Sequence, residues 1–310
     1  MAIHNLARMV LRALSYPDLD VKKTYRLERS VKKGIKAPFK PMYRLWDHKV
    51  YVDGRQILAR IYPPQQDDGT DTLLFFHGGG WVTESVDTYN AVCHQLAEHM
   101  RCKVISVEYR LAPEHRFPDG LEDCYAVAKT LLQDYDAWRV FFPGKITLIG
   151  DSAGANLAAA VSLLARDRGE FSVARQILVY PSTYNDHSEN SPFDSVRENG
   201  TDYLLTSKKI QDYMALYMRS EADLESPYFA PLLAEDLRCQ PRTLILTAQY
   251  DPLRDEGEEY GRRLARAGNR VRVYRMKDTL HGFFSLGPGF AHVKCAYRAI
   301  RAFLDEDDDA

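Results

Sequence analysis

A serine between two glycines is the first residue of this chain that could carry out chemistry. Ser152 lies in the pentapeptide GDSAG at 150–154, which follows the apolar run 146–149 and precedes an alanine-rich helical pattern at 153–165. Strand, Gly-X-Ser-X-Gly and helix is the order of a nucleophile elbow, in which a tight turn lifts the serine hydroxyl above the sheet edge. Because the pentapeptide is short and also occurs in ordinary turns, its chemistry depends on partners elsewhere in the chain.

A serine hydroxyl needs a base that takes its proton and a third group that holds the base in one tautomer. His281 is the strongest candidate for the base, because it follows the predicted strand 271–275 and opens a His-Gly-Phe turn. Asp251 is the candidate for the acid, because it comes directly after the predicted strand 243–248. The chain order serine, acid, histidine is the order expected when such a triad is carried on loops after parallel strands.

Two other aspartates compete for the role of the acid. Asp255, with Glu258 three residues later, has the pattern of a capping box, so we interpret it as the N-cap of a helix at 256–267. Asp278 precedes His281 by three residues in what we expect to be a single loop, which is an awkward spacing for alignment on the ring.

Three successive glycines follow another predicted strand, in His-Gly-Gly-Gly-Trp at 77–81. Attack on an ester carbonyl places negative charge on oxygen, and preorganised N–H groups stabilise it. We predict the backbone amides of Gly79, Gly80 and Ala153 as these donors. Neither Gly-X-Gly-X-X-Gly nor Gly-Lys-Ser/Thr is present, which argues against a phosphate-binding loop. We expect His77 to fix the loop by hydrogen bonding rather than to act as a second base.

The elements around these residues alternate between strands and helices. An opening hairpin is predicted at 45–52 and 56–62, because Asp-Gly at 53–54 is a strong two-residue turn signal. Continuous apolar strands then alternate with helices, which predicts a mainly parallel sheet of about eight strands with helices on both faces. The other strands are predicted at 72–76, 103–108, 146–150, 176–180, 243–248 and 271–275, and helices at 121–134, 153–166, 256–267 and 291–304.

One segment interrupts this alternation. Some sixty residues separate the strand 176–180 from the strand 243–248, and they include an amphipathic run at 207–218. Long insertions in compact domains are usually functional lids, so we predict a helical cap over the strand ends. The predicted organisation is an N-terminal cap segment at 1–45, a first core part at 46–183, a cap insertion at 184–221 and a second core part at 222–310.

Composition and charge are those of an ordinary soluble globular protein. The 310 residues are 45% hydrophobic and 27% charged, with a net charge of -2. Residues 1–44 hold eleven Lys and Arg against three acidic residues, so this segment carries +8 and the remainder -10. Without aromatic interleaving or a repeated basic motif, we interpret it as a solvated flap and predict no nucleic acid and no membrane as partner. Residues 21–41 are charged and we expect them to be irregular.

The cysteines and the N-terminus indicate a cytoplasmic protein. The five cysteines are widely spaced and contain no Cys-X-X-Cys pair, so we expect reduced thiols packed mostly as small hydrophobic residues. The amphipathic N-terminal stretch is interrupted by Arg8 and Arg12, unlike the apolar centre of a signal peptide. No stretch approaches about 18 consecutive apolar residues, so nothing is predicted to span a membrane.

In this combination and order the motifs resemble the hormone-sensitive-lipase-like family of α/β-hydrolase esterases. The match runs from about residue 73 to the end of the chain and rests on HGGGW at 77–81, YRLAPEH at 109–115, GDSAG at 150–154, DPLRDEG at 251–257 and HGF at 281–283. The resemblance implies an α/β-hydrolase fold with a helical cap, Ser152, Asp251 and His281 as the triad, and the three predicted amides as the oxyanion hole.

The resemblance has further implications and one departure. It implies that Glu114 is a structural acid under the oxyanion loop, and that the chain can form a homodimer through its last strand and helix. The departure is Glu84, which stands where the family often has glycine after the HGGGW motif. A carboxylate there would narrow or charge the mouth of the pocket, so the substrates of relatives are a weaker guide at this position.

We therefore predict a serine carboxylesterase that acts on short- to medium-chain acyl esters and needs no cofactor and no metal. Trp81, Tyr203, Leu204 and Phe283 are the candidate pocket walls. An amidase or arylformamidase-like acyl hydrolase is the first alternative, although such enzymes tend to vary the third loop glycine, which is present here as Gly80. A non-catalytic small-molecule receptor is the second, although such a protein is expected to lose the histidine.

Overall fold

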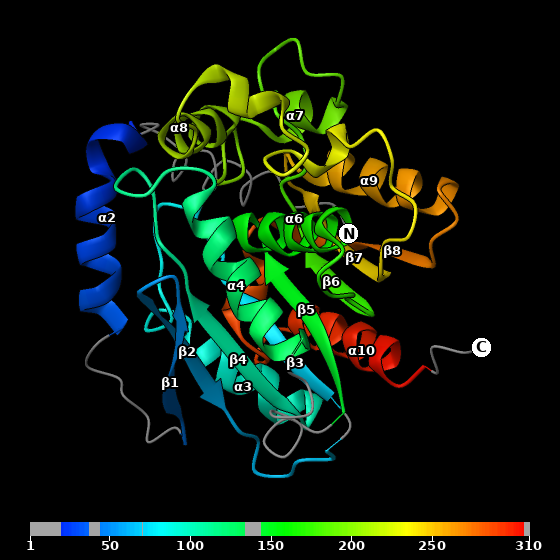
Figure 1. Ribbon diagram of the computed structural model, residues 1–310. Helices are drawn as coiled ribbons and strands as arrows, with labels where there is room; N and C mark the ends of the chain where they lie inside the picture. The colour runs from blue at the N-terminus through cyan, green and yellow to red at the C-terminus, as the bar shows by residue number, and fades with distance from the viewer. Residues whose placement is uncertain (1–19, 37–43, 70, 134–143, 307–310) are drawn as a thin grey trace.

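The centre of the protein is a single sheet of eight strands, in the order β1-β2-β4-β3-β5-β6-β7-β8 (Figure 1). The computed structural model describes residues 20–36, 44–69, 71–133 and 144–306. The hairpin strands β1 (Trp46–Val52) and β2 (Arg55–Tyr62) pair antiparallel, and β2 also pairs antiparallel with β4 (Lys103–Glu108). All other neighbouring strands are parallel, so the predicted mainly parallel sheet with an antiparallel edge is confirmed.

The remaining strands lie close to their predicted positions. They are β3 (Asp71–Phe76), β5 (Lys145–Asp151), β6 (Arg175–Val179), β7 (Arg242–Tyr250) and β8 (Val271–Leu280). β8 is five residues longer than predicted, because Lys277 and Asp278 interrupt its second half, which therefore lacks a continuous apolar run. Short 3-10 helices are found at Glu221–Glu225, Pro231–Leu233 and Phe283–Leu286.

Helices cover both faces of the sheet, as its continuous apolar strands predict. Within β3, Leu74 and Phe76 join one buried cluster, whereas Leu73 and Phe75 join the other. The first cluster lies under α4 (Asp119–Gln133), α6 (Ala153–Arg168) and α9 (Arg254–Arg266). The second lies under α3 (Asn90–Met100) and α10 (Ala291–Leu304). Successive side chains of β3 therefore point to opposite faces of the sheet and pack against the helices on each face.

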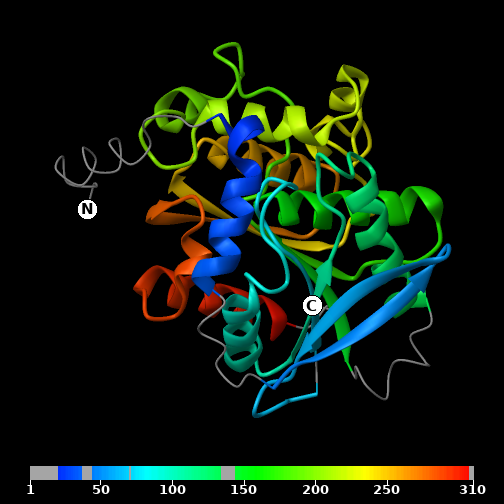
Figure 2. The same cartoon turned by 90° about the vertical axis from the view of Figure 1, so that its left-hand side faces the viewer.

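A layer of helices lies above the carboxyl ends of the parallel strands, and we call α2, α7 and α8 the cap. α7 (Asp194–Asn199) and α8 (Ser207–Tyr217) come from the long insertion, and α2 (Val21–Lys36) packs against α8 (Figures 1 and 2). The helix predicted within 207–218 is confirmed. The N-terminal end of α2 meets α8 through Asp212, whose carboxylate accepts the Val21 N–H at 3.4 Å and lies 3.8 Å from the Lys22 ammonium.

The expectation that residues 21–41 are irregular is wrong for α2. Val21 and Tyr25 are buried and four residues apart, and Glu28 and Lys32 continue the same face in partly buried positions. This face packs on the rest of the protein, while charged residues cover the outer face. Because most residues of the segment are charged, its average hydrophobicity is low, and the helical spacing of the few buried positions was overlooked. The amphipathic stretch before residue 20 lies outside the described residues.

Buried cysteines behave as predicted. All five cysteines are free thiols, and Cys93, Cys102 and Cys124 are buried among apolar side chains, whereas Cys239 and Cys295 are exposed. Burial raises the pKa of the Cys93, Cys102 and Cys124 thiols, so these side chains stay neutral and act as small hydrophobic residues.

Candidate active site

The turn between β5 and α6 holds Ser152 in a strained conformation. Its φ is 55° and its ψ is -120°, a region that a residue with a side chain seldom occupies and that costs about 1–3 kcal/mol. A Cβ on Gly150 would lie 2.3 Å from the Gly154 carbonyl, and a Cβ on Gly154 would lie 2.0 Å from the Phe76 carbonyl oxygen. Both glycines are therefore required by close backbone packing. The Ser152 N–H donates to Val179 O at 2.9 Å, which ties the turn to β6.

The structure brings together the three residues predicted as nucleophile, base and acid. His281 follows β8 directly, and Gly282 in the left-handed region turns the chain behind it. His281 Nε2 lies 2.9 Å from Ser152 Oγ, and His281 Nδ1 lies 2.7 Å from Asp251 Oδ2. Asp251 is fully buried after the end of β7. A fully buried carboxylate at this distance favours the tautomer with hydrogen on Nδ1, which leaves Nε2 to accept the serine proton.

The rival aspartates have other partners. Asp255 Oδ2 accepts the Ser195 N–H at 2.8 Å, and its carboxylate pairs with Arg254. The predicted capping box of Asp255 and Glu258 is wrong, because α9 already begins at Arg254 and the Glu258 carboxylate forms an ion pair with Arg275 at 2.7 Å. Asp278 is part of strand β8 rather than of a loop with His281.

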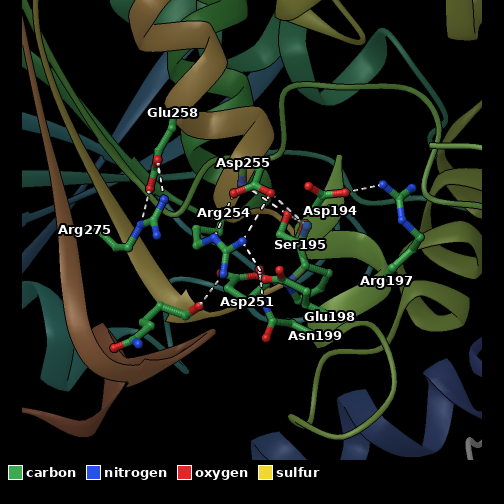
Figure 3. A network of polar contacts seen from close by, with 12 residues as sticks. Asp194, Ser195, Arg197, Glu198, Asn199, Asp251, Arg254, Asp255, Glu258 and Arg275 are labelled. Atoms are coloured by element: carbon green, nitrogen blue, oxygen red, sulfur yellow. Dashed lines mark hydrogen bonds and ion pairs between the residues drawn. The ribbon is translucent and has the colours of Figure 1, made fainter. Parts of the chain in front are cut away.

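Helix α7 of the cap is bonded to the loop that carries the acid (Figure 3). Asn199 Nδ2 donates to Asp251 O at 3.3 Å, and Ser195 Oγ donates to Pro252 O at 2.7 Å. At the surface, the Arg254 guanidinium reaches Glu198 at 2.8 Å. These contacts hold the loop of Asp251 from outside the sheet, and sequence reasoning missed them because no motif marks α7.

The glycine loop after β3 presents backbone amides to the same place. Gly79 has a φ of 101° and Gly80 a φ of 61°, and the Gly79 carbonyl accepts the N–H groups of Val82 and Thr83 at 3.1 and 2.8 Å. Within the described ranges, the N–H groups of Gly79, Gly80 and Ala153 donate no hydrogen bond to another residue. Ala153 also begins α6, whose N-terminal dipole favours negative charge at this point. The three predicted amides thus line one side of Ser152.

His77 supports this loop from below. It is fully buried, its ring is stacked on Tyr109 with centroids 4.4 Å apart, and its Nδ1 lies 2.8 Å from Gly78 O. The Tyr109 hydroxyl donates to His77 O at 2.7 Å. Burial lowers the pKa of His77, so the imidazole stays neutral. These contacts match the predicted role of His77 in fixing the loop.

A second buried aspartate connects the serine turn to the glycine loop, and sequence reasoning missed its role. Asp151 Oδ1 accepts the Gly78 N–H at 2.9 Å, while Oδ2 accepts the hydroxyls of Tyr89 at 2.9 Å and Tyr180 at 3.2 Å. The Tyr180 ring in turn lies 4.6 Å from the His281 ring. Burial raises the pKa of Asp151 to about 6, although these hydrogen bonds favour the charged form.

A cavity of about 290 Å³ opens above Ser152. Its floor is formed by the serine turn, the glycine loop and His281, and its roof by residues of the cap. The cap residues at the roof are Lys32 of α2, Ile210 and Tyr213 of α8, and Leu205 just before α8. The residues predicted as nucleophile, base and N–H donors therefore line one partly apolar cavity.

Comparison with known proteins assigns the chain to a family. Residues 73–285, more than two thirds of the chain, match the family described as "alpha/beta hydrolase fold". The chain belongs to the α/β-hydrolase family. The predicted fold class and the resemblance to hormone-sensitive-lipase-like esterases are thereby confirmed.

Several relatives of this α/β hydrolase are named esterases. It is 37% identical over 248 residues to an arylesterase of Saccharolobus solfataricus, which covers 80% of this chain and 79% of the relative. It is 34% identical to an ethyl acetate hydrolase of Pseudomonas putida, over 76% of this chain and 74% of the relative. Among solved structures, a hyperthermophilic esterase of Pyrobaculum calidifontis superimposes with a TM-score of 0.85 at 37% identity, covering 98% of each chain.

The predicted pocket walls of the hydrolase are only partly right. Trp81 lines the cavity, but Tyr203, Leu204 and Phe283 do not. Tyr203 packs against Tyr250 with ring centroids 5.1 Å apart, Phe283 packs edge-on against Tyr180, and Leu204 is 39% exposed on the surface. The apolar roof is formed instead by Leu205, just before α8, and by Ile210 and Tyr213 on the face of α8 that covers the cavity.

Arg29 of α2 joins the cap to the glycine loop of the hydrolase. Its Nε donates to Val82 O and its Nη2 to Ala112 O, both at 2.6 Å, and its two terminal nitrogens pair with the Glu114 carboxylate at 3.0 Å each. Glu114, expected as a structural acid, thus acts on the loop through Arg29. No helix in the described ranges is long and apolar enough to cross a bilayer.

Proposed function

We propose that this α/β hydrolase is a serine carboxylesterase that cleaves small acyl esters through an acyl-serine intermediate. The observation that carries the proposal is the chain of contacts from Ser152 Oγ to His281 at 2.9 Å and from His281 to Asp251 at 2.7 Å, at the floor of a cavity with three N–H donors alongside. The relatives named arylesterase and ethyl acetate hydrolase support an ester as the substrate.

Acylation begins when Ser152 Oγ attacks the ester carbonyl carbon. His281 Nε2 takes the serine proton, and the Asp251 carboxylate stabilises the resulting imidazolium and holds its orientation. The carbonyl oxygen becomes an oxyanion that accepts hydrogen bonds from Gly79, Gly80 and Ala153. His281 then gives its proton to the leaving alcohol, the C–O bond breaks, and the acyl group stays on the serine.

Deacylation repeats these steps with water in place of serine. His281 removes a proton from a water molecule, whose oxygen attacks the acyl carbon, and the oxyanion forms again on the same donors. When the tetrahedral intermediate collapses, His281 returns the proton to Ser152 Oγ and the carboxylic acid leaves. No electron transfer takes place, and every proton passes through the imidazole.

The size of the cavity supports short- to medium-chain acyl esters. A volume of about 290 Å³ is just below the roughly 300–1,000 Å³ typical of small-molecule sites. Leu205, Ile210 and Tyr213 give it an apolar roof that suits an aliphatic or aryl group. The predicted homodimer and the cytoplasmic location remain predictions, and the size of the protein in solution would test the first.

The test is hydrolysis of p-nitrophenyl esters from acetate to palmitate by the wild type and by Ser152→Ala. We expect the wild type to prefer short and medium chains, and the variant to lose activity by about 10⁴-fold or more while it keeps its circular dichroism spectrum. Hydrolysis that survives in a folded Ser152→Ala variant would overturn the proposal. A folded wild type that cleaves anilides or formamides but no ester would identify an amidase instead, and one that binds esters without turnover would identify a receptor.

A further inference from the structure

Glu84 places a carboxylate beside the proposed oxyanion hole. Its backbone has a φ of 70°, in the left-handed region that disfavours residues with a side chain, and its side chain is only 12% exposed. It lines the cavity, and a Cβ on Gly79 would lie 2.7 Å from Glu84 Cγ, so the two residues are in direct packing contact. A buried negative charge at this point would repel the negative charge that forms on the substrate oxygen.

Lys32 of α2 supplies the opposite charge. Its ammonium lies 2.7 Å from Glu84 Oε1 and 2.7 Å from Glu28 Oε1, and it donates to Thr83 Oγ1 at 3.3 Å. Lys32 lines the same cavity as Glu84. Burial by itself would lower the pKa of Lys32, but the carboxylates of Glu84 and Glu28 outweigh it and raise the pKa, so the ammonium stays charged at neutral pH.

The same cluster fixes the roof over the glycine loop. Tyr213 of α8 lies against Gly80, and its hydroxyl donates to Glu28 at 3.4 Å. Lys32 therefore sits where α2, α8 and the turn from Gly79 to Glu84 meet. The charge balance of the proposed oxyanion hole depends on a helix that is far from it in the sequence.

We propose that Lys32 is a positioning residue for ester hydrolysis, which neutralises Glu84 and thereby allows a carboxylate to lie against an oxyanion-hole glycine. The proposal rests on the proposed function, because it concerns the oxyanion of that reaction. In Lys32→Met the Glu84 charge loses the Lys32 ammonium, and the oxyanion forms next to it. Loss of one oxyanion-hole donor typically lowers kcat about 10²- to 10³-fold, so an uncompensated charge outside the hole should lower kcat about 10- to 100-fold.

The test compares Lys32→Met, Glu84→Gln and the double variant on a p-nitrophenyl ester, with kcat and KM measured separately. We expect Lys32→Met to lower kcat about 10- to 100-fold with little change in KM, and the double variant to recover most of that loss because it removes the unbalanced charge. Glu84→Gln alone should keep a kcat at or above that of the wild type. Lys22→Met, which removes a charge from the same helix near Asp212 and outside the cavity, is the matched control and should not change kcat.

The outcomes separate this proposal from the proposed function. If Ser152→Ala abolishes hydrolysis but a folded Lys32→Met retains the wild-type kcat, the role of Lys32 is wrong and the esterase stands. The role is also wrong if kcat of the double variant is as low as that of Lys32→Met, because the loss would then come from the missing contacts of Lys32 and not from the charge of Glu84. If Lys32→Met does not fold, Glu84→Gln still tests the proposal: a tenfold or larger decrease in its kcat would overturn the role of Lys32. Hydrolysis that does not need Ser152 would overturn both proposals.

Discussion

The ring of Tyr213 lies directly over the backbone of Gly80: a Cβ added to Gly80 would lie 2.4 Å from Tyr213 Cγ. One residue belongs to the glycine loop and the other to helix α8 of the cap, and they are more than 130 positions apart. The aromatic ring of Tyr213 thus packs directly on the backbone of Gly80, one of the proposed N–H donors. Glycine is required at residue 80 both for its φ of 61° and for this close approach.

The first prediction follows from that contact. Gly80→Ala should lower kcat/KM by at least about 10²-fold, because the methyl group displaces either the donor or α8. Tyr213→Ala in the same chain should restore part of the activity by making room. Gly268→Ala is the matched control, since Gly268 has a φ of 90° but nothing within 4 Å of the added Cβ. It should lower the midpoint of thermal unfolding but leave kcat/KM unchanged, and an equal loss of activity in both variants would contradict the steric explanation.

The second prediction distinguishes Asp251, in the loop after β7, from Asp255, in the first turn of α9. Asp251→Asn should lower kcat by about 10⁴-fold, because an amide favours the wrong tautomer of His281. Asp255→Asn should have a far smaller effect on kcat, since its carboxylate contacts Ser195 N–H and Arg254 rather than the imidazole. Steady-state kinetics on one ester measure both. A large loss in Asp255→Asn with a stable fold would mean that the acid has been misassigned.

The third prediction concerns the pH dependence of stability and the buried carboxyl of Asp151. Burial raises its pKa from 3.8 to about 6, so the folded state binds the proton more tightly than the unfolded state. The contribution of this group to stability is therefore fully present below about pH 4 and is lost as the pH rises through about 6. The shift corresponds to about 3 kcal/mol.

Urea unfolding at several pH values tests this sign. The free energy of unfolding of the wild type, minus that of Asp151→Asn, should fall by up to about 3 kcal/mol between about pH 4 and about pH 7. Asp255→Asn is a control of opposite sign. Although burial opposes it, hydrogen bonds from Arg254 and from the Ser195 amide lower the pKa of Asp255. The contribution of Asp255 is therefore present above about pH 4 and lost as the pH falls below it, so the difference between the wild type and this variant should stay nearly constant from about pH 5 to about pH 7 and shrink below about pH 4. Parallel curves for Asp151→Asn and the wild type would refute the raised pKa.

The fourth prediction tests the link between α2 and the glycine loop. Arg29→Ala removes the donors of the Val82 and Ala112 carbonyls and the partner of Glu114, which should lower the free energy of unfolding by about 1–3 kcal/mol. It should also lower kcat, because the loop loses an anchor next to its donors. Arg26→Ala, one turn away on the exposed side of α2, should change neither quantity measurably. Similar losses in both variants would show that α2 contributes only general helix packing.

The sequence by itself predicted the order of the strands along the chain and the three residues, Ser152, Asp251 and His281, that the structure brings together. Apolar runs such as 72–76 and 103–108 are local signals, because a strand buried on both faces must be apolar at every position. Ser152 and the HGGGW loop are recognisable for a similar reason. A Cβ on Gly150 would clash with Gly154 inside the same turn, so that requirement is local, whereas Gly154 is required by the Phe76 carbonyl oxygen of the neighbouring strand.

Only the tertiary structure decided how the cap closes the site. Helix α2 is held on the protein by long-range contacts of Val21, Tyr25 and Arg29, and its charged sequence alone did not show that its helical face would be covered. Likewise, Tyr203 and Tyr213 are both aromatic residues of the insertion, and only their packing shows that the second covers the cavity. The pairing of Lys32 with Glu84 joins segments about fifty residues apart, and no local pattern encodes such a distance.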